Sequence, residues 1–151
     1  KEALWLMVGK VNSGEALLAA GETTVTLNSQ DTNEKAQKLR KPFGATQGKG
    51  GRNQEAILSV INKFQSLKVS RFNDVAAISF ASDSHDNTEA AGAIGDLLAL
   101  EKAKKLKLKP EEFLKNHNSF NFFKKTGDLI YAEQKCFNVA DLMLVLNLPK
   151  E

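Results

Sequence analysis

The sequence predicts an α/β domain in which a largely parallel or mixed β-sheet is flanked by helices in three layers. Short apolar or β-branched runs of strand length alternate with segments whose apolar residues recur at helical spacing, an order typical of this class. The run 75–81 is almost continuously apolar, as strands of parallel sheets usually are. With 151 residues, 42% of them hydrophobic, the chain can bury one sizeable core, so a single domain is expected over 1–151.

The N-terminal part predicts a helix followed by two strands. The apolar residues of segment 2–11 are spaced as on one buried helix face. The run 16–20 has the length of a buried strand, and 23–27 is β-branched and alternates apolar with polar residues, as a half-buried strand does. Residues 28–47 are polar and predict a long loop, of a length that compact domains seldom contain unless the loop has a function or is disordered.

The rest of the chain continues the alternation. Pro110 suits the first position of a helix, where its missing N–H costs nothing, and Gly127 suits a helix end. The expected helices cover 51–64, 90–106, a segment from Pro110 and a short segment from Asn118 to Gly127, and the expected strands cover 75–81, 128–132 and 142–146, the last of which could also be helical.

Composition excludes several classes of function. Lys and Arg number 21 against 18 Asp and Glu, a net charge of +3, which is too small and too scattered for a nucleic-acid-binding protein. The chain has no apolar run of the roughly 18 residues that span a bilayer and no signal-peptide pattern. Cys136 is the only cysteine, so an internal disulfide is excluded, which fits a reducing compartment. We expect a cytoplasmic protein and, because the chain opens at Lys1 within a helical pattern, a piece of a longer one.

A glycine-rich stretch directly precedes the central helix. Gly48, Gly50 and Gly51 let the backbone turn tightly and leave its N–H groups uncovered, so that the helix start could receive an anion. Arg52 adds a fork of donors suited to carboxylate or phosphate. The alternative is an ordinary turn in which Arg52 pairs with a surface carboxylate.

An acidic loop, 82–87, follows the strand predicted over 75–81. In open α/β sheets ligands bind at such strand ends, and Asp83 and Asp86 could hold Mg²⁺ through carboxylate oxygens. The alternative is structural, since Asp86 with Glu89 three residues later forms a capping box for the next helix. His85 and His117 are expected to be exposed loop residues.

The segments around these residues resemble one family. Residues 48–55 resemble the G-x-G-G-R-N-Q-E motif of the MOFRL domain, the C-terminal domain of class II glycerate kinases. Further stretches that resemble it, in the same order, are 20–25 (G-G-E-T-T-V), 82–93 (T-D-G-x-D-G-x-T-D-A-A-G-A), 118–123 (D-S-Y-x-F-F), 127–130 (G-D-L) and 138–142 (N-V-x-D-L). The resemblance extends over about residues 14–146.

The resemblance implies a two-domain kinase. Such an enzyme transfers the γ-phosphoryl group of ATP to D-glycerate, with Mg²⁺ (magnesium), in a cleft between this domain and a larger N-terminal domain that is absent from this chain. It implies that Arg52 binds the substrate carboxylate or the transferring phosphate and that Asp83 is the general base. The substrate-binding residues would be Glu22, Gly50, Gly51, Asn53, Asp86 and Asn138, and the metal ligands Asp83 and Asp86. A homo-oligomer is compatible with this assignment, whereas nucleic-acid and membrane partners are not expected.

Some positions differ from the family's pattern. Ser84 and Asn87 stand where the family has glycines, and Cys136 and Phe137 stand where it usually has Gly-Thr. These differences favour an alternative function, a free-standing MOFRL-like module that binds an anion or assembles with a partner without catalysis. A dinucleotide-binding domain is a third hypothesis, for which residues 48–51 match G-x-G-x-x-G poorly.

Overall fold

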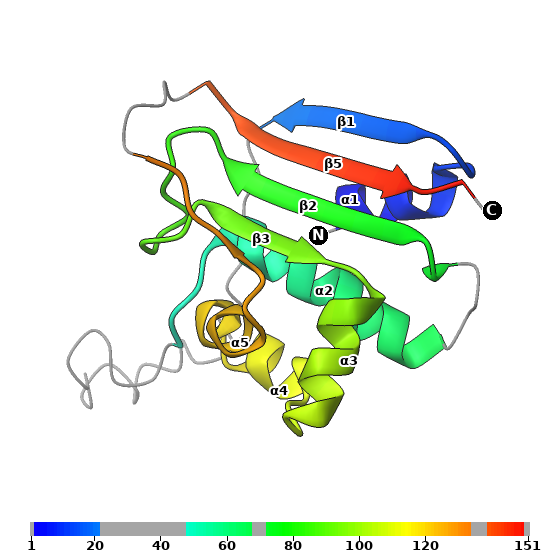
Figure 1. The fold of residues 1–151 in the computed structure, drawn as a ribbon. Coiled ribbons are helices and arrows are strands. Elements are labelled where there is room, and N and C mark those ends of the chain that lie inside the picture. Colours follow the sequence, from blue (N-terminus) through cyan, green and yellow to red (C-terminus); the bar gives the residue numbers. More distant parts are fainter. Residues whose placement is uncertain (1, 22–47, 68–71, 134–138, 150–151) are drawn as a thin grey trace, which may run out of the picture.

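The structure is a computed structural model that describes residues 2–21, 48–67, 72–133 and 139–149. Its strands form one sheet in the order β1-β5-β2-β3-β4 (Figure 1). The strands are β1 (Ala16–Gly21), β2 (Val75–Ala81), β3 (Gly92–Gly95), β4 (Leu129–Ile130) and β5 (Asp141–Asn147). The strand predicted over 23–27 and the loop predicted over 28–47 lie outside the described residues.

Every neighbouring pair of described strands is antiparallel. The α/β class is confirmed, but the prediction of a largely parallel or mixed sheet is wrong for these strands. The prediction rested on the apolar run 75–81, and that run does form β2. An apolar run indicates that both faces of a strand lack polar side chains, but it does not determine the direction of the neighbouring strands.

The described helices pack against one face of this sheet, and α1 and α2 pass behind the strands in Figure 1. They are α1 (Glu2–Lys10), α2 (Arg52–Leu67), α3 (Leu97–Lys105), α4 (Pro110–Lys115) and α5 (Ser119–Thr126). Leu4 of α1, Ile57 of α2 and Val145 of β5 are fully buried in the layer between helices and sheet. The described part therefore has two layers, not the three that were expected.

The helix predicted over 90–106 is wrong in its first half. Gly92–Gly95 form the strand β3, which pairs with β2, and α3 begins only after Asp96. A Cβ atom on Gly92 would lie 2.0 Å from the carbonyl oxygen of Ser79, so this glycine permits a close approach of strands that a side chain would prevent. The helix start is then set by the Asp96 carboxylate, which accepts the N–H of Ala99 at 2.7 Å.

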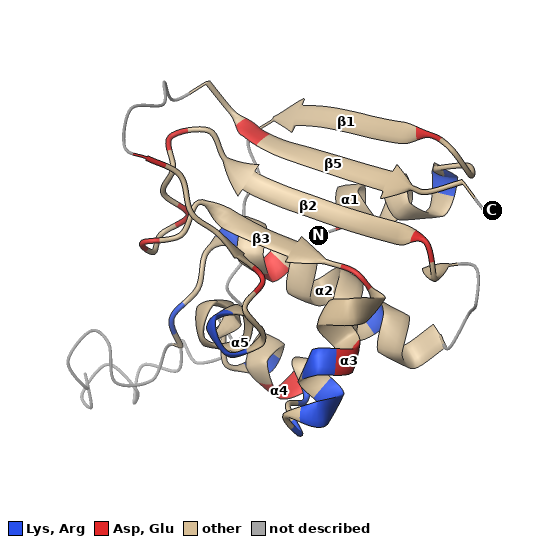
Figure 2. Cartoon of the chain, in the orientation of Figure 1, with Lys and Arg blue, Asp and Glu red and all other residues tan. Residues whose placement is uncertain are grey.

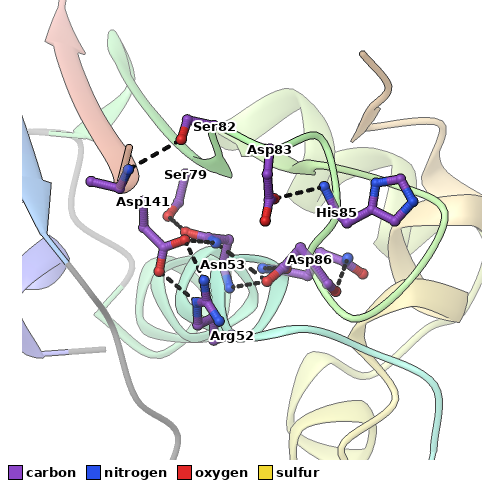
Figure 3. A network of polar contacts seen from close by, with 10 residues as sticks. Arg52, Asn53, Ser79, Ser82, Asp83, His85, Asp86 and Asp141 are labelled. Atoms are coloured by element: carbon purple, nitrogen blue, oxygen red, sulfur yellow. Dashed lines mark hydrogen bonds and ion pairs between the residues drawn. The ribbon is translucent and has the colours of Figure 1, made fainter. Parts of the chain in front are cut away.

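The antiparallel register brings distant parts of the chain together at one end of the sheet. Asp141, the first residue of β5, lies opposite Gly21 of β1 on one side and Ala81 of β2 on the other. The acidic loop leaves β2 at this end, and the N-terminus of α2 lies beneath it (Figure 3). Arg52, Asn53, Asp83 and Asp86, which the sequence singled out, therefore lie at this end of the sheet. None of the described helices has the length and apolar character needed to cross a membrane.

Candidate functional site

The first turn of α2 is capped by Asp86. The backbone N–H of Asn53 donates to Oδ1 of Asp86 at 3.1 Å, and that of Gln54 donates to Oδ2 at 2.8 Å. Asp86 is only 1% exposed, so the acidic loop supplies a buried carboxylate to the positive end of the helix. The capping box predicted for Asp86 and Glu89 is wrong, because no helix begins there and Asp86 caps α2 instead. The helix start does not present bare amides to an anion.

The glycines before α2 allow close packing. A Cβ atom on Gly51 would lie 1.8 Å from the carbonyl oxygen of Asp86, and one on Gly50 would lie 2.2 Å from Oγ of Ser119. The acidic loop and the start of α5 therefore fill the region in which backbone N–H groups were expected to be exposed. The substrate-binding role of Gly50 and Gly51 stays a prediction.

Arg52 is held by a buried carboxylate. Its Nε donates to Oδ2 of Asp141 at 2.6 Å and its Nη2 donates to Oδ1 at 2.9 Å (Figure 3). The Asp141 side chain is 0% exposed, whereas that of Arg52 is 40% exposed. The ion pair is thus not the surface pair that the sequence left open as an alternative. It fixes the planar guanidinium at the boundary between the core and solvent.

Asn53 connects the two buried carboxylates. Its Nδ2 donates to Oδ1 of Asp141 at 3.0 Å and to Oδ1 of Asp86 at 3.2 Å, and its Oδ1 accepts the hydroxyl of Ser79 at 2.5 Å. Asn53 and Ser79 are both 0% exposed. A buried polar network whose members satisfy one another specifies a single arrangement. The network therefore fixes the position of Asp141, and through Asp141 that of the Arg52 guanidinium.

Burial raises the pKa of Asp86 above its ordinary value of 3.8, against the opposing effect of the hydrogen bonds from Gln54 and Asn53 and of the nearby Arg52 charge. A carboxyl group with a raised folded-state pKa stabilises the fold most at low pH, and this contribution is lost as pH rises through the folded-state pKa. We therefore expect the stability advantage of wild type over Asp86→Asn to shrink as pH rises from about 4 towards 7. Denaturant unfolding at several pH values measures it. An advantage that grows with pH would contradict the raised pKa.

Two residues of the acidic loop, those that stand where the family has glycines, adopt the backbone conformation that glycine favours. Ser84 has φ 71° and Asn87 has φ 55°, in the left-handed region. Each side chain compensates with a hydrogen bond, from Ser84 Oγ to the carbonyl of Glu133 at 3.1 Å and from Asn87 Nδ2 to the carbonyl of Gly50 at 3.1 Å. The loop therefore takes positive φ angles at both positions without glycine.

The donors at this site do not suit a magnesium ion. Both carboxylate oxygens of Asp86 already accept hydrogen bonds within the buried network, and Asp83 accepts the N–H of His85 at 3.1 Å. Across the described ranges, no three His, Cys, Asp or Glu side chains are grouped so that they could hold a metal. Because Mg²⁺ needs oxygen ligands that face it together, a metal role for Asp83 and Asp86 stays a prediction that this geometry does not favour.

The network also contains residues that the sequence did not single out. Asp141 and Ser79 are part of it, and Ser82 Oγ accepts the N–H groups of Val139 and Ala140 at 2.9 and 3.1 Å. Asp141 belongs to the N-V-x-D-L stretch, but nothing in its spacing indicated a partner 89 residues away. Glu22 and Asn138, both predicted as substrate-binding residues, lie outside the described residues.

A third buried carboxylate, Glu55, belongs to the same G-x-G-G-R-N-Q-E stretch as Arg52. Glu55 is 3% exposed, and its Oε1 lies 2.6 Å from Nδ1 of His117. The side chain of His117 is 29% exposed, so His117 lies in a loop as predicted but is only partly exposed. This pair joins α2 to the segment between α4 and α5, which gives His117 a structural role.

Comparison with known proteins agrees with these motifs. The MOFRL family model matches residues 15–141. Glycerate 2-kinase of Pyrococcus horikoshii is 30% identical over 131 residues, which cover 86% of this chain and 25% of that protein. A putative hydroxypyruvate reductase of Agrobacterium vitis is 29% identical over 131 residues, which cover 86% of this chain and 25% of that protein.

A solved structure shares the fold. The crystal structure of glycerate kinase from Thermotoga maritima superposes with a TM-score of 0.73 at 28% identity, over 97% of this chain and 33% of that one. The chain therefore spans between a quarter and a third of the length of these relatives. With the family model matching most of its residues, the chain belongs to the MOFRL family.

Proposed function

We propose that this chain is the MOFRL domain of a glycerate kinase-like enzyme that transfers the γ-phosphoryl group of ATP to D-glycerate. In this proposal the chain is the C-terminal domain, and a larger N-terminal domain completes the cleft. The observation that carries the proposal is Arg52, whose guanidinium is fixed by a fully buried carboxylate and still reaches solvent. The names of the relatives support the choice of reaction.

The chemistry of phosphoryl transfer suits such an arginine. The reaction needs mainly positioning and neutralisation of the charge that develops on the transferring group. Arg52 would bind the glycerate carboxylate or the phosphoryl oxygens, and because Asp141 already orients it, little orientation has to be gained when substrate binds. The network through Asn53 keeps Asp141 in place.

Other residues complete the proposed site. Asp83 lies on the acidic loop above Asp86 (Figure 3) and is proposed as the general base that takes the proton from the attacking hydroxyl group. Glu22 and Asn138 are proposed to border the same cleft. Asp86 acts through Asn53 and α2 rather than on substrate, because its oxygens are engaged within the domain. ATP is the proposed phosphoryl donor, and the proposed location is the cytoplasm. The proposed role of this domain depends on Arg52 and not on a metal ion bound by the domain's own residues.

A reductase is the second candidate function, because one relative is named a putative hydroxypyruvate reductase. The native polypeptide that contains residues 1–151 should be assayed for ATP-dependent formation of phosphoglycerate from D-glycerate and, in parallel, for hydroxypyruvate-dependent oxidation of NADH and NADPH. We expect the first activity and not the second. Reductase activity alone would replace the kinase proposal, and neither activity would favour a non-catalytic anion-binding or assembly module. Chain 1–151 by itself is expected to be inactive in both assays.

A further inference from the structure

The sheet has a second face, turned away from the described helices, that is entirely apolar. It is formed by alternate residues of four strands, at positions 16, 18 and 20, 142, 144 and 146, 76, 78 and 80, and 92 and 94. Every one of these positions holds Ala, Leu, Ile, Phe or Gly. Leu18 lies opposite Leu144, Leu144 opposite Ile78, and Ile78 opposite Ile94, so one apolar row crosses the sheet. We call this surface the open face.

The open face is exposed on β1 and at Ile94 and half-buried on β5 and β2, in contrast with the other side of the same strands. Leu18 is 71% exposed and Ile94 is 37% exposed, whereas Ala77 and Val145, which point towards the helices, are 0% exposed. An antiparallel sheet with one solvated face normally carries polar side chains on that face. Figure 2 shows the charged residues at the strand ends and on the helices, with the strand centres free of them.

This pattern indicates what kind of surface covers the open face. Strands that are apolar on both sides are typical of sheets with helices on both faces, and apolar patches of this extent on a protein surface mark interaction sites. The open face offers no charge for an ion pair and no side-chain hydrogen-bonding group. Its occupant must therefore contribute an apolar stripe, such as the buried side of an amphipathic helix.

We propose that the open face packs against an apolar helical layer formed by a part of the same polypeptide that lies outside residues 1–151. The length of the relatives favours this occupant over a second copy of the chain, because 75% of the Pyrococcus horikoshii protein lies beyond the matched part. A tethered segment also needs no contact between molecules, since its effective concentration at the face is high. The proposal does not depend on the reaction that the protein catalyses.

Thiol labelling of an engineered cysteine tests the proposal. Cys136→Ser removes the one thiol of chain 1–151, and Leu18→Cys then places a thiol on the open face, in the edge strand β1. The labelling rate is compared between chain 1–151 and the native polypeptide that contains it. We expect rapid labelling of the chain and labelling slower by about fiftyfold or more in the native polypeptide, because a covered thiol reacts only when the layer opens. The matched control is Leu106→Cys, at the end of α3, where Leu106 is 51% exposed and where equal rates are expected.

Three results would overturn the proposal. Equal labelling of Leu18→Cys in the chain and in the native polypeptide, or a native polypeptide no longer than this chain, would show that no segment in cis covers the face. Labelling of chain 1–151 that slows as its concentration is raised roughly a hundredfold would identify a second copy as the occupant. A loss of kinase activity without a change in labelling would affect the proposed function and leave this proposal standing.

Discussion

Replacing Arg52 with alanine is expected to lower kcat/KM for glycerate phosphorylation by about a hundredfold or more in the native polypeptide, which corresponds to about 3 kcal/mol of lost charge stabilisation. The change removes the guanidinium that the buried network holds at the edge of the site, paired with Asp141 at 2.6 and 2.9 Å. Steady-state kinetics with D-glycerate and ATP measure the effect. Because the proposed contact strengthens as charge develops, kcat should fall together with kcat/KM.

The alanine variant also leaves Asp141 buried without its cationic partner, so a loss of folding has to be separated from a loss of chemistry. Arg52→Lys keeps a positive charge but cannot form the two-pronged contact with Asp141, and it should recover only part of the activity. Added guanidinium ion at a non-denaturing concentration should partly rescue the alanine variant but not the lysine variant. Near-normal kcat/KM in a folded Arg52→Ala protein would remove Arg52 from the mechanism.

Gly51→Ala is expected to destabilise the domain by about 3 kcal/mol or more, the upper part of the range for forcing atoms into a packed site. The added Cβ atom would lie 1.8 Å from the carbonyl oxygen of Asp86 and 2.2 Å from its Cγ. Relief would require the acidic loop to move away from α2, which breaks the cap that Asp86 forms on Asn53 and Gln54. The free energy of unfolding, from urea denaturation monitored by circular dichroism, measures the effect.

Gly9→Ala is the matched control. Gly9 lies within α1, and a Cβ atom there would meet nothing within 4 Å. Alanine favours a helix over glycine by roughly 0.5 to 1 kcal/mol, so this variant should be slightly more stable than wild type. If both glycine variants lost stability to the same extent, the contact with Asp86 would not explain the result for Gly51.

Local patterns in the sequence predicted most elements but not the direction of the strands. The periodicity of 51–64 and the apolar runs 16–20 and 142–146 correspond to α2, β1 and β5, because helical spacing and strand length are properties of a short segment. Strand direction depends on pairing between segments that are far apart, such as Ala16 with Leu146. The sheet was therefore wrongly expected to be parallel or mixed.

The helix wrongly predicted over the first half of 90–106 has a similar cause. Alanine and glycine at 90–93 fit a helix by composition, but Gly92 and Ala93 pair with Phe80 and Ser79 instead. A contact with another strand thus overrides the local preference.

The sequence predicted only part of the candidate site, because contacts between distant segments determine the rest. Motifs drew attention to Arg52, Asn53 and Asp86, which the structure brings into one network. Asp141 lies in a recognised stretch, but nothing near it in the sequence indicated that it pairs with Arg52, because that contact arises only when β5 lies beside β1 and β2. The helix start looked open to an anion in the sequence, yet it is occupied by a carboxylate from a loop 33 residues further along.

The position of β5 between β1 and β2 affects when this domain can fold on the ribosome. β5 pairs with both β1 and β2 but is the last described strand, so β1 has no described partner until residues up to 147 have been synthesised. Asp141 belongs to the same strand, so its ion pair with Arg52 cannot form until the 88 intervening residues have been translated. A nascent chain stalled before β5 would expose apolar strands and a half-built polar cluster, which makes this the stage at which chaperones are needed most.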